Sequence, residues 1–184
     1  MSKRYIYILP MGNISSRFLE ALRINTEDHL ELPCRLMQPI DSPEYAFNQE
    51  RGQYQSLEIL KQILELAPDD AVKILGLCTV DLYVPILTFI FGQAQIDGPA
   101  AIVSLKRLNE EFYGKAYDEA ITFQRALKEI IHEIGHTFGL AHCDSPRCVM
   151  SLSIKVERVD QKGAEYCEGC RALIGPKLMR CKTS

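Results

Sequence analysis

Three of the chain's four histidines lie between residues 132 and 142, at a spacing that suits a metal centre. On a helix, His132 and His136 stand one turn apart on the same face, so both imidazoles can bind one zinc ion at about 2.0–2.1 Å. Glu133 lies beside the first histidine, where its carboxylate can act on a zinc-bound water without ligating the metal. These residue types at this spacing predict zinc-assisted hydrolysis, with Glu133 as the general base.

Gly139 and His142 complete the predicted centre. A glycine enters the left-handed backbone region readily, so Gly139 can end the helix and turn the chain back. His142 would then return as the third ligand, and the fourth position on zinc would stay open for water or substrate. A single helical histidine is more often an ordinary core or surface residue, but the complete H-E-x-x-H-x-x-G-x-x-H pattern argues against that alternative.

Four cysteines follow directly, in two short pairs separated by a loop. The pairs are Cys143 with Cys148 and Cys167 with Cys170. Together they predict a tetrahedral thiolate cage for a structural zinc, with Zn–S distances near 2.3 Å. The alternative is two disulfides, which would close very small loops in a chain that offers no secretory context. Three basic residues near the cysteines are expected to soften the charge of the cage: Arg147, Lys162 and Arg171.

Met150 lies inside the loop that the cage would close, shortly after the third histidine. The ordered set now resembles the archaemetzincins, a branch of the metzincin peptidases marked by the extended zinc motif followed by four cysteines and a methionine. The resemblance rests on His132, Glu133, His136, Gly139, His142, Cys143, Cys148, Met150, Cys167 and Cys170. It implies a metzincin-like zincin fold and places Met150 in a turn beneath the zinc-binding histidines. Some metzincins carry a tyrosine two residues after this methionine; Leu152 stands there in this chain, so no such helper is expected.

Elements that position these residues can be read from the apolar patterning. It predicts an α/β (α+β) fold with a twisted mixed sheet packed on helices, and the resemblance implies an antiparallel edge strand at the rim of the substrate cleft. A hairpin is expected around the turn residues Asp97-Gly98-Pro99. The expected strands are residues 4–9, 32–38, 72–78, 87–96 and 100–105. The expected helices are residues 15 or 16 to 28, 53–67 and the zinc helix 117–138.

The chain is predicted to form a single catalytic domain, residues 1–184. Its upper subdomain, residues 1–139, would end with the zinc helix. Its small C-terminal subdomain, residues 140–184, would contain the methionine turn and the cysteine cage. Residues 143–170 show too little regular apolar patterning to order themselves, so the cage is expected to hold them.

Composition excludes several classes of protein. The net charge is −3, and the slight basic excess after residue 143 has only Tyr166 as a stacking surface, so nucleic acid is not expected as a partner. No run is long enough to span a membrane, and residues 5–11 are too short and too aromatic for a signal peptide. Seven cysteines suit a reducing cytoplasm, and a monomer is expected. Outside the cage, Cys34 and Cys78 are expected as buried strand thiols, Cys181 as an exposed tail thiol and His29 as a surface residue at a helix end.

The sequence therefore favours a zinc-dependent metallopeptidase that acts on peptides or proteins and holds two zinc ions, one catalytic and one structural. The resemblance adds aminopeptidase-type cleavage, which is attributed to some archaemetzincins. The alternative is a non-catalytic or weakly active zinc-binding module that acts through a partner. Glu133 argues against it, because a purely structural site gains nothing from a carboxylate beside its first histidine.

Overall fold

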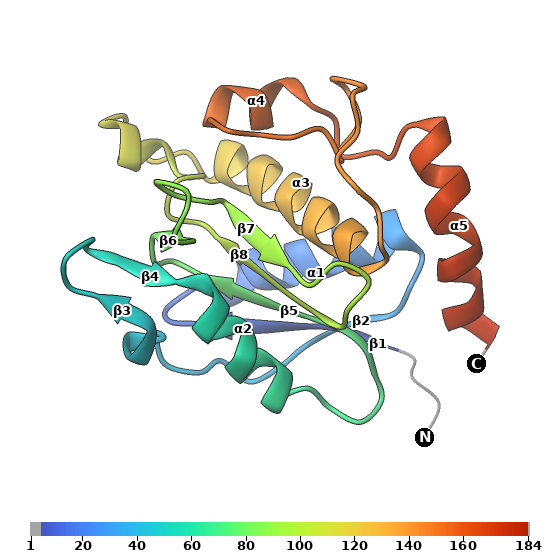
Figure 1. Cartoon of the computed structure of the whole chain (residues 1–184), viewed down its shortest axis with the longest axis horizontal. Coiled ribbons are helices and arrows are strands. Elements are labelled where there is room, and N and C mark those ends of the chain that lie inside the picture. Colours follow the sequence, from blue (N-terminus) through green and yellow to red (C-terminus); the bar gives the residue numbers. More distant parts are fainter. Residues whose placement is uncertain (1–4, 184) are drawn as a thin grey trace.

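A five-stranded mixed sheet forms the centre of the protein (Figure 1), as seen in a computed structural model that describes residues 5–183. The strand order is β2-β1-β5-β8-β7. The first four strands run parallel, and β7 is antiparallel to β8 at the edge. The strands are β1 (Tyr5–Met11), β2 (Cys34–Leu36), β5 (Ala71–Cys78), β7 (Gly92–Ala94) and β8 (Ala100–Ser104). The predicted mixed sheet with an antiparallel edge strand is confirmed; Arg4, included in the first predicted strand, lies outside the described residues.

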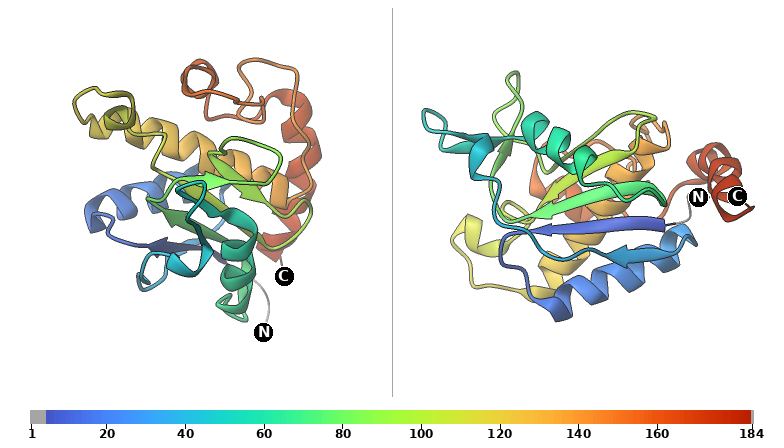
Figure 2. Two further views of the ribbon diagram at one scale, coloured as in Figure 1. Left: turned by 60° about the vertical axis from the view of Figure 1, so that its left-hand side comes forward. Right: turned by 90° about the horizontal axis from the view of Figure 1, so that it is seen from below.

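Helices cover both faces of this sheet (Figure 2). α1 (Ser16–Leu30) and α3 (Glu119–Thr137) share one core with Ile6 and Ile8 of β1. α2 (Ser56–Glu65) packs in a second core with Tyr7 and Leu9 of the same strand. Successive side chains of a strand point to opposite faces, so a strand covered on both sides must be apolar almost throughout. This explains the near-continuous apolar sequence of β5.

A second, small sheet was not predicted. It consists of β3 (Phe47–Asn48), β4 (Gln53–Gln55) and β6 (Leu82–Tyr83), preceded by the 3₁₀ turn η1 (Glu44–Ala46). The prediction of a helix from residue 53 was wrong by one turn, because the N–H of Tyr54 donates to the Asp81 carbonyl at 2.8 Å and draws β4 into this sheet. The predicted strand 87–96 is also shorter. Residues 84–91 form a loop that returns to β6, where the Ile90 N–H donates to the Leu82 carbonyl at 3.0 Å.

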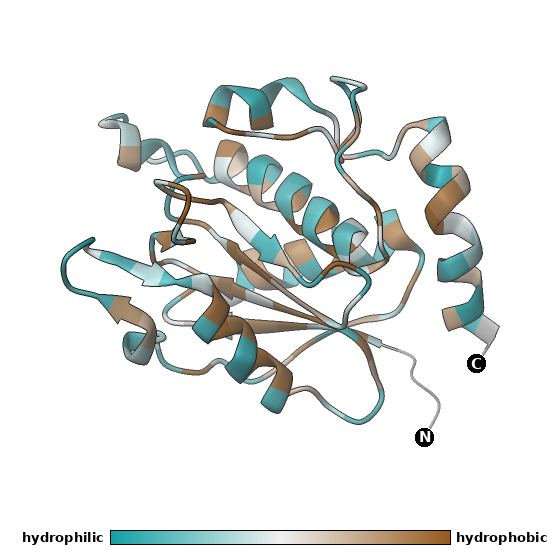
Figure 3. Ribbon diagram, viewed as in Figure 1, coloured by the Kyte–Doolittle hydropathy of each residue, from teal (hydrophilic) through white to brown (hydrophobic). Residues whose placement is uncertain are grey.

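Three helical elements follow the sheet without having been predicted: η2 (Glu110–Tyr113), α4 (Val156–Gln161) and α5 (Glu168–Thr183). The zinc helix, predicted from about residue 117, begins at Glu119, because the Asp118 carboxylate caps it by accepting from the Ile121 N–H at 2.9 Å. α5 has no single apolar face and contains Pro176, which hides it from periodicity arguments (Figure 3). Cys181 lies on this helix half-buried against the core, so the expectation of an exposed tail thiol was wrong.

The predictions for Cys34, Cys78 and His29 are confirmed. Cys34 and Cys78 are buried in β2 and β5, and burial raises the pKa of each thiol to about 12. His29 lies in the last turn of α1, half-exposed, with Nε2 3.3 Å from a Glu165 carboxylate oxygen. No helix within residues 5–183 has the length and apolar character needed to cross a membrane.

Gly76, in the middle of β5, allows α2 to pack closely on the sheet. A Cβ at this position would lie 2.5 Å from Cδ1 of Ile63, a fully buried α2 side chain, and 3.4 Å from the sulfur of Met11. A well-packed core has no room for such an atom without displacement of its neighbours.

Gly76→Ala is therefore expected to lower the free energy of unfolding by about 1–3 kcal/mol. Ile63→Val removes the methyl group that would clash and costs about 0.5–1.5 kcal/mol alone. The double variant should lose less than the sum of the two single losses, because the cavity receives the new methyl group. Denaturant unfolding of the wild type and the three variants measures this coupling; strictly additive losses would contradict the packing argument.

Candidate functional site

The three predicted zinc-binding histidines converge on one point. Nε2 of His132 and Nε2 of His136 lie 3.1 Å apart, and one ring nitrogen from each of the three histidines lies within 4.8 Å of the others. Two nitrogens bound to the same tetrahedral zinc lie about 3.3 Å apart, given bonds of about 2.0 Å. His132 and His136 are buried, whereas His142 is exposed on the outer side. The arrangement fits a metal ion reached from solvent on one side.

Backbone carbonyls orient the two buried imidazoles. Nδ1 of His132 lies 2.7 Å from the Val149 carbonyl, and Nδ1 of His136 lies 2.7 Å from the Leu140 carbonyl. Donation from Nδ1–H leaves the Nε2 lone pair directed at the shared point, which is the usual support of a metal-binding histidine. Burial also lowers the pKa of all three histidines. Each imidazole is therefore held in the neutral form that binds metal.

Gly139 ends α3 as the sequence predicts. Its φ is 81°, in the left-handed region, and the Leu140 N–H returns to the Gly135 carbonyl at 3.0 Å. A side chain here would also be crowded, because a Cβ would lie 2.8 Å from Nζ of Lys177 and 3.0 Å from a carboxylate oxygen of Asp97. The chain therefore reverses at Gly139 and brings His142 back to the other two histidines.

The last carbonyls of α3 are capped from three directions. Lys177 of α5 donates to the Phe138 carbonyl at 2.7 Å, and Lys73 of β5 donates to the Thr137 carbonyl at 2.7 Å. The N–H of Asp97, in the turn between β7 and β8, donates to the His136 carbonyl at 3.0 Å. Positive charge and N–H donors at a helix C-terminus satisfy its free carbonyls. The end of the helix that carries the histidines is thus fixed to the sheet, to the hairpin turn and to α5.

Glu133 is buried between α3 and the edge strand β7. Burial raises the pKa of its carboxyl group well above the ordinary value, the nearby Glu129 raises it further, and Lys162 lowers it. Gly92 of β7 provides the space for Glu133, since a Cβ there would lie 2.7 Å from Cγ and 2.8 Å from Oε1 of Glu133. Sequence reasoning missed Gly92, although a glycine inside a strand often marks such a close approach.

Lys162 has a different position from the one expected. Instead of facing the cysteines, its ammonium group forms a 2.8 Å ion pair with Glu129, and both side chains are almost fully buried. The same Nζ lies 3.3 Å from Nδ1 of His132 and 3.4 Å from the Ser151 carbonyl. The expectation that Lys162 offsets the charge of the cage was therefore wrong. Glu129 lies one helical turn before Glu133, and nothing in the sequence marks it as the partner of a lysine on a later segment.

Met150 is buried and packs against α3 at Gly135, the residue before His136. Its sulfur would lie 2.5 Å from a Cβ at Gly135, so the glycine within the zinc motif permits this contact. The carbonyl of Met150 accepts from the Cys143 N–H at 2.9 Å. Tyr166, fully enclosed beside the same glycine, donates its hydroxyl to the Ile131 carbonyl at 2.9 Å. The C-terminal segment is thus docked on the helix at Ile131 and Gly135, the residues that precede His132 and His136.

The four predicted cage cysteines also lie together. Their sulfurs are all within 4.8 Å of one another, and Sγ of Cys143 lies 3.7 Å from Sγ of Cys167. Sulfurs bound to one tetrahedral zinc lie about 3.8 Å apart, whereas a disulfide needs about 2.05 Å. All seven cysteines are free, so the disulfide alternative is not supported. The backbone N–H of Cys170 contributes most to lowering the pKa of Cys167 to about 7, which favours the thiolate form that binds metal.

A cleft of about 590 Å³ opens over the histidines. Its walls come from the loop before β7, from β7 itself, from α3 and from the segment after Met150. The described residues that line it are Leu87–Gly92, Ala94, Ile96, Glu129, His132, Glu133, His136, Gly139, Ala141, His142 and Leu152–Ile154. Three neutral imidazoles, two on a helix and one on the segment that follows it, and a buried carboxylate face a cleft along a sheet edge. This arrangement defines the class of metal-dependent hydrolases.

Comparison with known proteins identifies the family within this class. The model of peptidase family M54 matches residues 11–175. The archaemetzincin of Methanocaldococcus jannaschii is 41% identical over 165 residues, which cover 90% of this chain and 89% of that protein. A crystal structure of the Archaeoglobus fulgidus archaemetzincin in complex with malonate superposes with a TM-score of 0.79 at 32% identity, covering 92% of this chain and 99% of that one. A zinc-dependent peptidase from Methanocorpusculum labreanum gives a TM-score of 0.83 at 30% identity, with the same coverage of 92% and 99%.

The chain belongs to peptidase family M54, the archaemetzincins. It is a zinc metallopeptidase, and peptides or proteins are its substrates. The family implies zinc, and the histidine and cysteine clusters are the two groups of side chains in residues 5–183 found to be placed to hold a metal ion.

Loss of the cysteine cage is expected to weaken metal binding at the histidines. The Cys143 N–H donates to the Met150 carbonyl, and the Val149 carbonyl orients His132. Loss of order around the cage would therefore disturb both hydrogen bonds. Cys167→Ser together with Cys170→Ser should reduce zinc affinity at the histidine site by roughly 10–100-fold. Chelator competition measures this affinity, and limited proteolysis should show new cleavage between residues 143 and 167. Cys181→Ser, on α5 outside the cage, is the matched control; an unchanged affinity in the double variant would mean that the two sites are independent.

Proposed function

We propose that His132, His136 and His142 hold a catalytic zinc and that Glu133 is the general base of peptide-bond hydrolysis. The convergence of three neutral imidazoles beside a buried carboxylate carries this proposal. When bound there, zinc supplies a Lewis acid that polarises the scissile carbonyl group and lowers the pKa of water.

Glu133 takes a proton from the attacking water and passes it to the leaving amine. Burial suits the side chain to this task, because a carboxylate that is poorly solvated accepts a proton more readily. Gly92 and the wall of β7 keep the carboxylate in place beside the histidines. No tyrosine follows Met150 to assist, since Leu152 stands at that position.

The edge strand β7 is the proposed guide for the substrate backbone. Within the described chain, β7 has a strand neighbour, β8, on one side only. An extended peptide can add to the open side around Phe91–Gln95 through main-chain hydrogen bonds, which places its carbonyl groups along the cleft without regard to side-chain identity. β7 lies directly beside Glu133, so this arrangement carries a peptide bond past the catalytic residues.

Internal cleavage fits the cleft better than removal of N-terminal residues. An aminopeptidase needs a group that binds the terminal ammonium, and a free carboxylate is the usual partner. Among the described residues of the cleft, the carboxylates are Glu129 and Glu133. Glu129 is already paired with Lys162, and Glu133 is assigned to the proton transfer. We therefore propose endopeptidase action in place of the aminopeptidase type that the sequence resemblance suggested.

The chain is proposed to carry two zinc ions, the second held by Cys143, Cys148, Cys167 and Cys170 in a structural site. We propose that residues 140–184 act with residues 1–139 as one catalytic domain, because the later segment supplies His142 and the carbonyl groups of Leu140 and Val149. Cytoplasmic location is supported by the seven free cysteines. A monomer is proposed as the working form. The family is one of peptidases, and no observation favours the non-catalytic module.

Removal of Glu133 should separate metal binding from turnover. Glu133→Ala is expected to keep both zinc ions while the rate of peptide hydrolysis falls by about 10²–10⁴-fold, because the base is lost and no ligand is. His136→Ala should lose the catalytic zinc as well as activity. Metal analysis and cleavage of a peptide library measure the two effects. His29→Ala is the control, a histidine removed from the cluster; full activity in Glu133→Ala would refute the assignment.

Blocking the substrate's N-terminus distinguishes the two modes of cleavage. N-acetylated and free forms of the same peptides are expected to be cut at the same internal bonds at comparable rates. The two described carboxylates of the cleft are already engaged, Glu129 with Lys162 and Glu133 in the proposed proton transfer. Mass spectrometry of the products gives the positions of the cuts. Loss of cleavage on acetylation, together with stepwise removal of single residues from the free peptides, would show aminopeptidase action instead.

A further inference from the structure

The cleft over the histidines exposes large apolar side chains on several sides. Ile154, Ile96, Leu152 and Leu87 are 71%, 63%, 51% and 50% exposed, and all four line it. Figure 3 shows the loop before β7 in brown, as a hydrophobic segment, and residues of this loop line the cleft. Exposure of apolar side chains to water is unfavourable. Several of them gathered at one concave surface therefore indicate a binding site.

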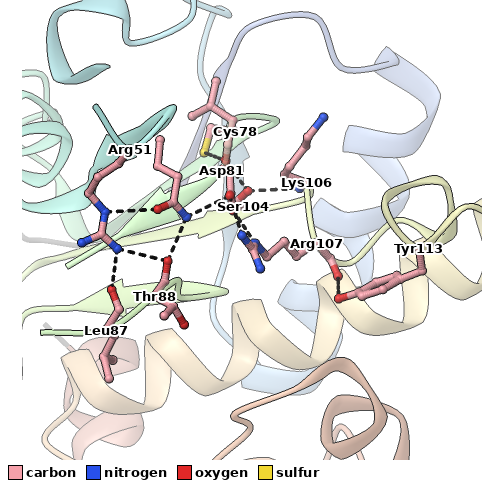
Figure 4. A network of polar contacts seen from close by, with 11 residues as sticks. Arg51, Cys78, Asp81, Leu87, Thr88, Ser104, Lys106, Arg107 and Tyr113 are labelled. Atoms are coloured by element: carbon pink, nitrogen blue, oxygen red, sulfur yellow. Dashed lines mark hydrogen bonds and ion pairs between the residues drawn. The ribbon is translucent and has the colours of Figure 1, made fainter. Parts of the chain in front are cut away.

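One apolar wall is a loop, residues 84–91, whose backbone is held from outside the cleft (Figure 4). Arg51 donates to the Leu87 carbonyl at 2.8 Å and to the Thr88 carbonyl at 3.2 Å. Gln53 donates to the same Thr88 carbonyl at 2.9 Å and to Asp81 at 2.9 Å. The carbonyl groups of Leu87 and Thr88 thus point to residues of the small sheet and its turn, while Leu87 also lines the cleft.

Arg107 fixes the end of this loop nearest to β7. Its guanidinium group binds both carboxylate oxygens of Asp81, at 2.6 and 2.7 Å, and lies 4.1 Å from the centre of the Phe89 ring. Phe89 in turn packs edge-on against Phe91, with ring centres 5.2 Å apart. A bidentate pair and a stacked ring hold a loop in one geometry. These contacts therefore hold the exposed apolar wall in one conformation.

The facing wall consists of Leu152, Ser153 and Ile154, directly after the methionine turn. The turn is held by the Ser151 N–H, which donates to the Cys148 carbonyl at 2.9 Å. Glu129 and Glu133, the carboxylates of the cleft, are both buried, and Glu129 is paired with Lys162. The part of the cleft open to a ligand thus offers apolar contact on two sides, and its described lining residues include no charged side chain other than these two buried glutamates.

We propose that this cleft selects peptide segments with bulky apolar side chains next to the bond that is cut, and that Leu87, Leu152 and Ile154 determine the selection. The inference rests on the proposed peptidase function and names its substrate class. A charged side chain would lose water here without gaining a partner, whereas a leucine or phenylalanine would bury apolar surface against both walls.

Binding to an inactive protein tests the inference apart from catalysis. Zinc-loaded Glu133→Gln is titrated with fluorescent N-acetylated peptides that differ at two central positions, either Leu-Leu, Phe-Leu, Asp-Asp or Lys-Lys. The apolar pairs are expected to bind at least about 10-fold more tightly than either charged pair, which is the scale of discrimination for a side chain in an apolar pocket. Equal affinities for all four peptides would overturn the proposal.

Variants of the wall identify the residues responsible. Leu152→Lys and Ile154→Lys, each in the Glu133→Gln background, should weaken the Leu-Leu peptide and strengthen the Asp-Asp peptide, so that the preference falls by about 10-fold or reverses. Leu173→Lys is the matched control, since Leu173 is 67% exposed on α5 and does not line the cleft. An equal effect of Leu173→Lys would show that overall charge, and not the wall, governs binding, and would overturn the assignment.

Turnover by the wild type keeps the two proposals separate. If the apolar peptides bind selectively but are not cut by the wild-type enzyme, the selection stands and the proposed internal cleavage fails. If peptides of all four kinds are cut at equal rates and bound equally, the peptidase function stands and the apolar selection fails.

Discussion

The whole site depends on two hydrogen bonds from imidazole to backbone, His132 to the Val149 carbonyl and His136 to the Leu140 carbonyl. An imidazole that keeps its Nδ1 proton for a fixed acceptor has its other nitrogen free for metal, in one orientation. Neither acceptor belongs to the helix that carries the histidines. The reversal at Gly139 supplies the Leu140 carbonyl, and the loop ordered by Met150 and the cysteines supplies the Val149 carbonyl. The geometry of the histidine cluster therefore depends on the junction between helix and loop.

The sheet contributes to the site through its edge strand, β7. Parallel strands need helical crossovers, and these cover both faces of β1 and β5, so the edge is the part of the sheet left open to a ligand. β7 is short and antiparallel, and its glycine allows the buried Glu133 to lie against the strand. The hairpin turn after β7 also caps α3 through the Asp97 N–H. The strand, the carboxylate and the histidines thus keep a fixed relation, since all are tied to the same helix.

Local chemistry could be predicted from the sequence where the residues concerned are close together in the chain. The zinc motif, the left-handed Gly139 and the cysteine pairs needed only a helix and a turn, and the alternation in β1 predicted a covered strand. Features that depend on contacts between distant segments could not be predicted from the sequence. β4 forms because Tyr54 pairs with a segment near Asp81, α5 has no apolar stripe to reveal it, and Lys162 meets Glu129 across two elements. Tertiary context decides such cases over local preference.

The order of the supporting groups along the chain has a consequence for biosynthesis. α3, with His132, Glu133 and His136, is synthesised before the Val149 carbonyl and well before Cys167 and Cys170. A nascent chain that ends before residue 149 contains Glu133 but neither the acceptor that orients His132 nor the tyrosine that docks on Ile131. The described arrangement of the three histidines therefore cannot form before residue 149 has been synthesised and has docked beside His132.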